Sequence, residues 1–325
     1  MKQLKFIDLF AGIGGFRLAL ESLNLCCVFS SEWDKPAQDT YQNNFNETPF
    51  GDITKIDSTQ IPDHDILCAG FPCQSFSISG KQLGFKDQRG MLFLEILRIA
   101  KAKKPKVIFL ENVSNLKQHD NGKTFQTIKK LLTDANYFVE EKIFNAKDFG
   151  LAQSRSRIII VASLNKPFDF GKIKVAKKAI VLKDIIDESC QDSLEPTEYT
   201  ILDPKLWKKQ KSGLIFCGYR NKELRKNGTR PNTEHLSRVH KQPNRIYHVN
   251  GTHPTLSSQE LSGRFFIYDG TNVRKLTIKE CYKLQGFPSS YLINPTRSEA
   301  YRQIGNSVPI KLIRAVAKQI IAQFF

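Results

Sequence analysis

One cysteine of the sequence lies where a thiol could act as a nucleophile. Residues 70–77 read Gly-Phe-Pro-Cys-Gln-Ser-Phe-Ser, and Cys73 follows Pro72 shortly after the mostly apolar residues 65–69. Because that apolar run predicts a buried strand, we expect the thiol on a proline-stiffened loop at a strand exit. This position suits covalent catalysis. Taken by itself, a free cysteine is more often a small buried side chain without chemistry.

Two further segments carry side chains that would complement a nucleophile. Glu111 follows the apolar residues 107–110, and a partly desolvated carboxyl group at a strand end can donate a proton at neutral pH. Residues 153–157 read Gln-Ser-Arg-Ser-Arg, and strand alternation predicts Arg155 and Arg157 on one face. Their guanidinium groups would bind an anion or a carbonyl, or else form salt bridges with acidic residues. A thiol, an acid and a guanidinium group around one pocket would suit attack on an electron-poor ring.

A glycine turn near the start of the chain predicts a ligand site. Residues 8–16 read Asp-Leu-Phe-Ala-Gly-Ile-Gly-Gly-Phe, a strand that runs into a turn and a helix. The G-x-G-G spacing differs from the dinucleotide motif and disfavours NAD. At the following strand ends, Glu32 could accept hydrogen bonds from ribose, Trp33 could pack on adenine, and Asp52 could accept from an adenine amino group. Either acid alone could be a solvated surface residue, but together they predict one crevice.

The composition favours a polyanionic partner. The 325 residues suffice for a large domain and a smaller one, and their net charge is +17 with a pI near 9.5. Residues 204–248 hold twelve Lys or Arg against two acids, with aromatic residues interleaved, so the charge is more concentrated than a generally lysine-rich composition would give. The sequence predicts no membrane span and no signal peptide. Seven scattered cysteines predict neither a disulfide framework nor a zinc site, and suggest a reducing cytoplasm.

The chemistry-bearing segments must be held by a strand–helix framework. Apolar runs and helical periodicity alternate over residues 1–163, which predicts an α/β fold with a mostly parallel sheet and helices on both faces. Thr277 is expected to cap a short helix, and residues 310–325 to form an amphipathic one. The predicted divisions are residues 1–184 for catalysis and cofactor binding, 185–272 as a smaller strand-and-loop domain, 273–300 as a hinge, and 301–325 returning to the first domain.

Eight segments resemble the cytosine-C5 DNA methyltransferases, and the chain is similar to the small bacterial HhaI-type members of that family. The segments occur in the family's order, and residues 185–272 are unmatched apart from a Thr-Leu element at Thr255. The resemblance implies a Rossmann-like fold for S-adenosylmethionine-dependent methyl transfer, plus a target-recognition domain. The matching segments are residues 6–16, 32–34, 51–53, 70–77, 111–113, 153–157, 274–288 and 301–309.

The resemblance also implies roles for individual residues. The methyl group would pass from S-adenosylmethionine to C5 of a flipped-out cytosine, leaving S-adenosylhomocysteine, without a metal. Cys73 would attack C6, Glu111 would protonate N3, Arg157 would contact O2, and Arg155 would support the cysteine loop. The residues implied to line the cofactor site are Phe10, Gly12, Gly14, Glu32, Trp33, Asp52, Ile53, Pro72, Leu92, Asn306 and Ser307.

Duplex DNA is the implied substrate. Residues 80–90, rich in glycine and basic side chains, are expected to act as a lid that touches phosphates. Arginine pairs bidentately with guanine, although most basic side chains in such interfaces contact phosphate. The residues expected to contact DNA are Ser77, Lys81, Arg89, Arg220, Arg225, Arg230, Arg238, Arg245 and Thr255.

The expected biology is that of a monomeric, cytoplasmic bacterial enzyme, associated with the nucleoid through DNA. It would protect host DNA in a restriction–modification system, with a cognate endonuclease that acts independently on the same site as a potential partner. One alternative is a tRNA cytosine-C5 methyltransferase with the same catalytic residues, which the large basic domain disfavours. Another is a catalytically inactive DNA-binding protein, against which the presence of Cys73, Glu111 and Arg157 argues.

Overall fold

The structure of the chain, a computed structural model, divides into two compact units. It describes residues 3–71, 91–187, 189–190, 192–221 and 232–325. Unit 1 consists of Met1–Asn145, Ser156–Val175 and Ser307–Phe325, and unit 2 of Ala146–Arg155 and Ala176–Asn306. Both the predicted target-recognition segment, 185–272, and the predicted hinge, 273–300, lie within unit 2. The chain returns to unit 1 at Ser307.

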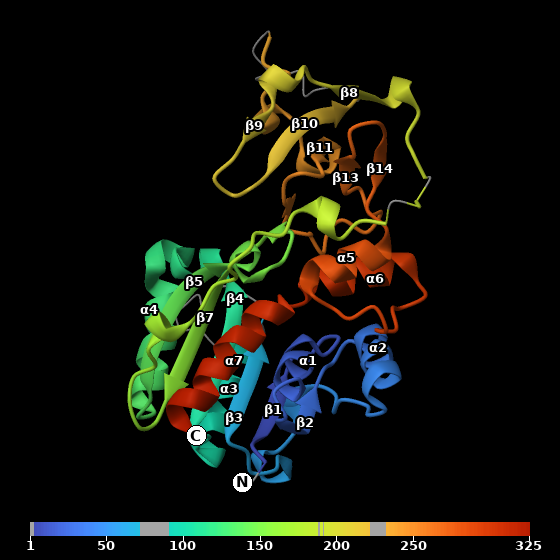
Figure 1. Cartoon of the computed structure of the whole chain (residues 1–325). Coiled ribbons are helices and arrows are strands. Elements are labelled where there is room, and N and C mark those ends of the chain that lie inside the picture. The colour runs from blue at the N-terminus through green and yellow to red at the C-terminus, as the bar shows by residue number, and fades with distance from the viewer. Residues whose placement is uncertain (1–2, 72–90, 188, 191, 222–231) are drawn as a thin grey trace, which may run out of the picture. The chain divides into compact units, whose positions relative to one another are not determined.

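Unit 1 is built on a six-stranded sheet in the order β2-β1-β3-β4-β7-β5 (Figure 1). Strands β1 to β4 are parallel, as expected, whereas β7 is antiparallel to both β4 and β5. The connection from β5 to β7 contains no crossover helix, so the chain reverses direction there. The strands are β1 (Lys5–Leu9), β2 (Cys26–Ser31), β3 (Ile66–Gly70), β4 (Val107–Val113), β5 (Phe138–Asn145) and β7 (Ser156–Ser163).

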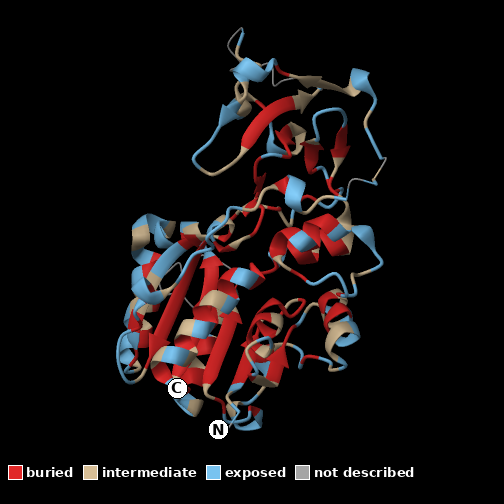
Figure 2. Cartoon of the chain, viewed as in Figure 1, coloured by how far each residue is buried: buried red, intermediate tan, exposed pale blue. Residues whose placement is uncertain are grey.

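Helices cover both faces of this sheet. On one face, the apolar side chains of α3 and α4 form a single core with alternate residues of the strands, such as Ile7, Leu67 and Leu110. The opposite face carries α1 and α7, and the ring of Phe16 in α1 meets that of Phe109 edge-on at 5.2 Å. The central strands are buried along most of their length (Figure 2). The helices of unit 1 are α1 (Gly15–Glu21), α2 (Lys35–Phe45), α3 (Met91–Lys103), α4 (Lys123–Asp134) and α7 (Ile310–Phe324).

Unit 2 is smaller and contains short strands with two helices. Five of its strands follow the order β14-β13-β11-β10-β8, and β9 pairs with β10. The aromatic side chains interleaved with the basic residues partly form its core, since Phe216 and Tyr247 are buried. Its elements are β6 (Gln153–Ser154), β8 (Tyr199–Ile201), β9 (Lys208–Lys209), β10 (Ile215–Arg220), β11 (Arg245–His248), β12 (His253–Pro254), β13 (Phe266–Tyr268), β14 (Val273–Lys275), α5 (Ile278–Gln285) and α6 (Arg297–Asn306).

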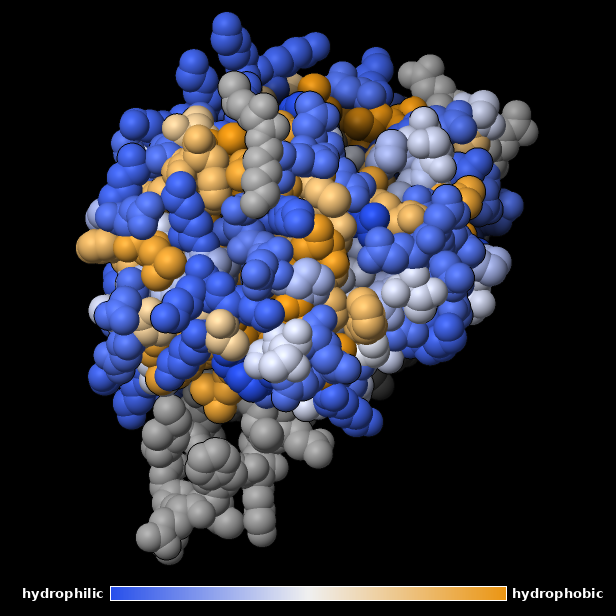
Figure 3. Space-filling model, turned by 90° about the horizontal axis from the view of Figure 1, so that it is seen from below, coloured by the Kyte–Doolittle hydropathy of each residue, from blue (hydrophilic) through white to orange (hydrophobic). Residues whose placement is uncertain are grey.

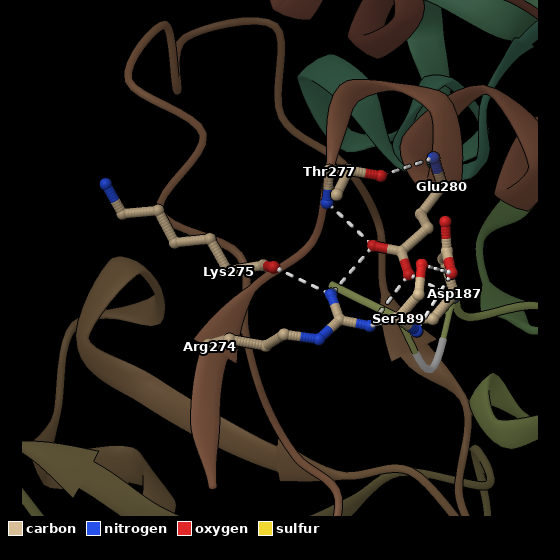
Figure 4. A network of polar contacts seen from close by, with 6 residues as sticks. All are labelled: Asp187, Ser189, Arg274, Lys275, Thr277 and Glu280. Atoms are coloured by element: carbon tan, nitrogen blue, oxygen red, sulfur yellow. Dashed lines mark hydrogen bonds and ion pairs between the residues drawn. The ribbon is translucent and has the colours of Figure 1, made fainter. Parts of the chain in front are cut away.

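A buried ion pair fastens α5 to the sheet of unit 2. Nη2 of Arg274, in β14, lies 2.8 Å from Oε1 of Glu280, in α5, and Nη1 bonds the other carboxylate oxygen (Figure 4). Glu280 also accepts from the amides of Thr277 and Asp187. Burial alone would raise the pKa of Glu280, but these hydrogen bonds and the nearby guanidinium lower it. Thr277 caps α5 as predicted, so one carboxylate joins the helix, β14 and the segment at Asp187.

The surface agrees with the strongly charged composition. Hydrophilic residues cover most of the face shown in Figure 3 and separate its smaller hydrophobic patches. Scattered apolar residues are usual on protein surfaces. Within the described part of the chain, no helix is long and apolar enough to cross a membrane.

Candidate active site

Glu111 and Arg157 form a buried ion pair in unit 1. Arg157 pairs in register with Val113 at the end of β4, and Glu111 shares the face of Val113, so the two charged side chains are diagonal neighbours. Nε of Arg157 lies 2.8 Å from Oε1 of Glu111, and the two side chains are 10% and 9% exposed. Burial lowers the pKa of Arg157, and the carboxylate of Glu111 opposes that shift. Arg157 thus forms the salt bridge that the sequence analysis gave as the alternative to binding an anion or a carbonyl, and its contact with a ring remains a prediction.

Asn112 fixes the backbone that leads to Cys73. Its side-chain Nδ2 donates to the carbonyl of Phe71 at 2.8 Å, in a buried position. Gly70 lies opposite Glu111 in the sheet, and a Cβ built on Gly70 would lie 3.9 Å from Oε2 of Glu111. The chain is thus held beside the acid as far as residue 71. Cys73 itself lies outside the described residues.

Arg155 has different partners from Arg157. Strand β6 ends at Ser154 and β7 begins at Ser156, so the alternation that predicted a shared face is interrupted at Arg155. Arg155 belongs to unit 2, where its Nη1 donates to the carbonyl of Leu256 at 3.2 Å and its Nη2 to that of Gly305 at 2.9 Å. Its side chain joins separate segments of unit 2. Its support of the cysteine loop remains a prediction.

The predicted glycine turn joins β1 to α1. Gly12 and Gly14 have φ angles of +54° and +78°, which side chains other than glycine rarely adopt. A Cβ on Gly14 would lie 2.2 Å from the ring of Phe45, whereas one on Gly12 would meet nothing within 4 Å. The amide of Gly12 donates to Oε2 of Glu32 at 2.8 Å. The turn is packed tightly at Gly14 and borders open space at Gly12.

Two further predicted cofactor segments lie near the end of β2: Glu32 and Trp33 follow the strand directly, and the chain before Asp52 runs beside it. Oε1 of Glu32 accepts from the amide of Asp34 at 2.9 Å, and burial raises the pKa of Glu32. Trp33 is 80% exposed. The amide of Glu32 donates to the carbonyl of Phe50, which brings the chain before Asp52 alongside β2. The structure therefore gathers the glycine turn, Glu32, Trp33 and Asp52 in one region of unit 1.

The remaining cofactor candidates have varied surroundings. Phe10 has a φ of +56° and is half-buried, and Ile53 is buried. Ser307 is buried in unit 1, and its Oγ would lie 2.9 Å from a Cβ on Gly15. Asn306 is exposed and is the last residue of unit 2. Pro72 lies outside the described residues. Leu92 lies in the first turn of α3 and is half-buried.

Asp8 is a buried acid that the sequence analysis did not single out. It lies in β1, two residues before Phe10, and is 1% exposed. Neither of its carboxylate oxygens has a hydrogen-bond partner among the residues that the structure describes. Burial raises the pKa of Asp8 to about 8, and the guanidinium group of Arg17 opposes the shift. An acid in the middle of an otherwise apolar strand is the signal that could have identified it.

We expect Asp8→Asn to stabilise the protein increasingly as the pH rises, in the absence of ligand. The pKa of Asp8 is about 8 in the folded chain, against an ordinary value of 3.8, so the folded state retains a proton that the unfolded state loses. Stability therefore falls as the pH rises from about 4 to about 8. Relative to the unaltered protein, the free energy of unfolding should increase by roughly 2–4 kcal/mol between pH 5 and 9.

Chemical denaturation at several pH values measures this difference. Asp63→Asn is a matched control, because the side chain of Asp63 is 95% exposed and its replacement should give a nearly constant difference. A pH-independent difference for Asp8→Asn would show that Asp8 ionises at its ordinary pKa in the folded protein.

The predicted DNA contacts are only partly described. Nη2 of Arg220 bonds Oε1 of Glu198 at 2.8 Å, and its guanidinium lies 4.9 Å from the centre of the Phe266 ring, which disfavours base reading by Arg220. Arg245 is half-buried and donates to the carbonyl of His240, whereas Arg238 is exposed. The hydroxyl of Thr255 donates to the carbonyl of Ser154. The remaining predicted DNA contacts lie outside the described residues: Ser77, Lys81, Arg89, Arg225 and Arg230.

Comparisons with known proteins identify the family of the chain. The family model for C-5 cytosine-specific DNA methylase matches residues 4–322. The chain is 43% identical over 331 residues to the Type II methyltransferase M.HhaI of Haemophilus parahaemolyticus, covering 98% of this chain and 94% of that protein. It is 44% identical over 327 residues to the Type II methyltransferase M.HaeII of Haemophilus aegyptius, covering 99% and 94%.

Solved structures confirm the fold. The methyltransferase EhMeth of Entamoeba histolytica matches with a TM-score of 0.73 and 21% identity, over 100% of both chains. The Dnmt2 methyltransferase of S. pombe matches with a TM-score of 0.72 and 19% identity, over 99% of this chain and 100% of that one. The family match spans nearly the whole sequence and confirms the resemblance seen in its motifs. The chain therefore belongs to the C-5 cytosine-specific DNA methylases, enzymes that transfer a methyl group from S-adenosylmethionine to cytosine in DNA.

Proposed function

We propose that this enzyme methylates one cytosine within a specific duplex sequence and thereby protects host DNA in a restriction–modification system. The observation that carries the proposed catalysis is the buried ion pair of Glu111 and Arg157. Glu111 lies beside Gly70, and the backbone leads from Gly70 to Cys73. The biological part is supported by similarity over nearly the full chain to proteins named Type II methyltransferases.

In the proposed reaction, Cys73 forms the covalent bond to the base. Its thiolate attacks C6 of the flipped cytosine while N3 is held and protonated at Glu111, which prevents charge from building up on the ring. Arg157 contacts O2 of the same base and holds Glu111 in place before the base arrives. After C5 has gained the methyl group, its proton passes to water and the electron pair of that C–H bond forms the double bond to C6 again. The sulfur of Cys73 leaves as a thiolate, and N3 returns its proton to Glu111.

The residues around the glycine turn fit S-adenosylmethionine, which supplies the electrophilic methyl group when bound. The carboxylate of Glu32 would hold the ribose, Asp52 and Trp33 the adenine, and the open space beside Gly12 would allow close approach to the backbone. We further propose S-adenosylhomocysteine as the product and a reaction without metal.

Residues 185–272, which lie within unit 2, are the proposed target-recognition domain. Arg238 and the exposed lysines of β9 are available for phosphate contacts. We propose that one monomer acts on each site, in the bacterial cytoplasm and on nucleoid DNA. A cognate nuclease would act separately on the same sequence.

The proposed function is tested by incubating the protein with isotopically labelled S-adenosylmethionine and either mixed-sequence duplex DNA or tRNA. We expect label in DNA, and bisulfite sequencing should place methylcytosine within one short recurring sequence. Label in tRNA but not in DNA would overturn the proposal in favour of RNA methylation. Methylation scattered without a sequence preference would overturn the proposed protective role.

A further inference from the structure

Arg98 links α3 to the segment that carries Asp52. It lies in the middle of α3, and its Nη2 donates to the carbonyl oxygens of Ile53 at 3.2 Å and Ile56 at 2.9 Å. These partners are 45 and 42 residues away along the sequence. One nitrogen atom therefore holds two backbone positions of another segment against the helix.

The segment that Arg98 holds has little internal support. It is a single 3-10 turn, Ile53–Lys55, in which the amide of Lys55 donates to the carbonyl of Asp52 at 3.0 Å and that of Ile56 to Ile53 at 3.3 Å. Such short turns are not stable alone and depend on their surroundings. The side chain of Ile53 is buried. Arg98 bonds the carbonyl of Ile53, the first residue of the turn, and that of Ile56, the residue that follows the turn.

The orientation of Asp52 depends on this turn. Oδ1 of Asp52 accepts from the amide of Thr54 at 3.0 Å and from its hydroxyl at 2.8 Å, so the carboxylate caps the turn. If the turn shifts, the carboxylate shifts with it. Arg98 therefore bonds the backbone of the turn that Asp52 caps, and the hydrogen bonds described include none between Arg98 and Asp52.

Charge alone does not account for the position of Arg98. Nε of Arg98 bonds Oε2 of Glu95 at 2.8 Å, within the same helix, and Nη2 lies 2.6 Å from the same oxygen, so the ion pair already engages the charge of the guanidinium group. The side chain of Arg98 is 34% exposed, so ordinary solvation was also open to it. Instead its planar donor group spans the gap to the turn, a geometry that suits arginine.

We propose that Arg98 is a positioning residue for the adenine end of S-adenosylmethionine, acting through the turn at Ile53 and the carboxylate of Asp52. The inference rests on the proposed cofactor role of Asp52. Arg98 contributes to cofactor affinity and not to the chemical step, because its contacts lie on the backbone of that turn. Its loss should weaken binding of any ligand with an adenosine group, whether or not DNA is present.

The test uses Arg98→Met, because methionine keeps the side-chain length and favours a helix but donates no hydrogen bond. Isothermal titration with S-adenosylhomocysteine in the absence of DNA should show about tenfold weaker binding. Methylation assays should show a similar rise in KM for S-adenosylmethionine, with kcat at saturation within about twofold. Arg98→Lys should recover most of the affinity, since an ammonium group can still donate to both carbonyls.

Glu95→Gln is the matched control. It removes the charged partner of Arg98 on the same helix and leaves the two carbonyl contacts, so the ligand affinity should stay within about twofold of the unaltered value. The inference is overturned if Arg98→Met, with an unchanged melting temperature, binds the ligand with native affinity. It is also overturned if Glu95→Gln weakens binding as much as Arg98→Met. Because binding is measured without DNA, these outcomes are independent of whether the protein methylates DNA or RNA.

Discussion

Replacing Cys73 by serine is expected to lower kcat for DNA methylation at least about 1,000-fold while leaving the affinity for S-adenosylmethionine within about twofold. A serine hydroxyl is almost entirely protonated at neutral pH and is a far weaker nucleophile than a thiolate. The proposed cofactor contacts come from the glycine turn, Glu32 and Asp52, none of which involves the thiol. Single-turnover methylation of a cognate duplex and calorimetric cofactor binding measure the two effects separately.

A second cysteine provides the control for this experiment. Cys190 is a half-buried free cysteine in unit 2, and Cys190→Ser should retain native turnover. A cytosine that is blocked at C5 should trap the covalent intermediate. After denaturation, we expect the unaltered enzyme to stay bound to DNA that contains this base and the Cys73→Ser variant to be released. Substantial methylation by Cys73→Ser would show that another residue is the nucleophile.

Local pattern was sufficient to predict most elements of unit 1. Apolar runs of four or five residues correspond to β1, β3 and β4, and the helical period corresponds to α3, α4 and α7. Thr277 could be predicted as a cap because a Thr followed three residues later by Glu280 makes two reciprocal bonds. The places of Glu32 just after β2 and of Glu111 near the end of β4 were also predictable, because each follows an apolar run; their roles remain predictions.

Features that depend on pairing between distant segments were not predictable. The reversed direction of β7 arises from the helix-free connection after β5, and the separate surroundings of Arg155 arise from the break between β6 and β7. The ion pair of Arg220 with Glu198, 22 residues away, could not be predicted from local pattern, and the contact of Arg220 with DNA remains a prediction. The pattern also gave no measure of burial for Asp8, whose charge is disfavoured because β1 lies between β2 and β3 and the side chain is 1% exposed.

The second large effect is expected for Glu111→Gln. Glutamine has nearly the same shape but cannot transfer a proton to N3, so kcat should fall about 100- to 10,000-fold. The substitution also leaves the guanidinium of Arg157, whose side chain is only 10% exposed, without its charged partner. Removing one partner of a buried pair commonly costs about 3–5 kcal/mol of stability. Loss of activity could therefore arise either from chemistry or from a disturbed fold.

A double-mutant cycle separates the two causes. Adding Arg157→Gln to Glu111→Gln removes the unpaired charge, so the double variant should be more stable than Glu111→Gln alone. With the Arg157→Gln single variant measured as well, the coupling energy between the two positions should be about 1–3 kcal/mol. Turnover should not recover, because neither the proton donor nor the contact with O2 is present. Glu141→Gln is the control, since Glu141 lies on the same sheet and pairs with Lys117 and Lys129, whose side chains are 49% and 41% exposed and therefore remain solvated without it. If turnover rises together with stability in the double variant, Glu111 serves the fold and not proton transfer to the base.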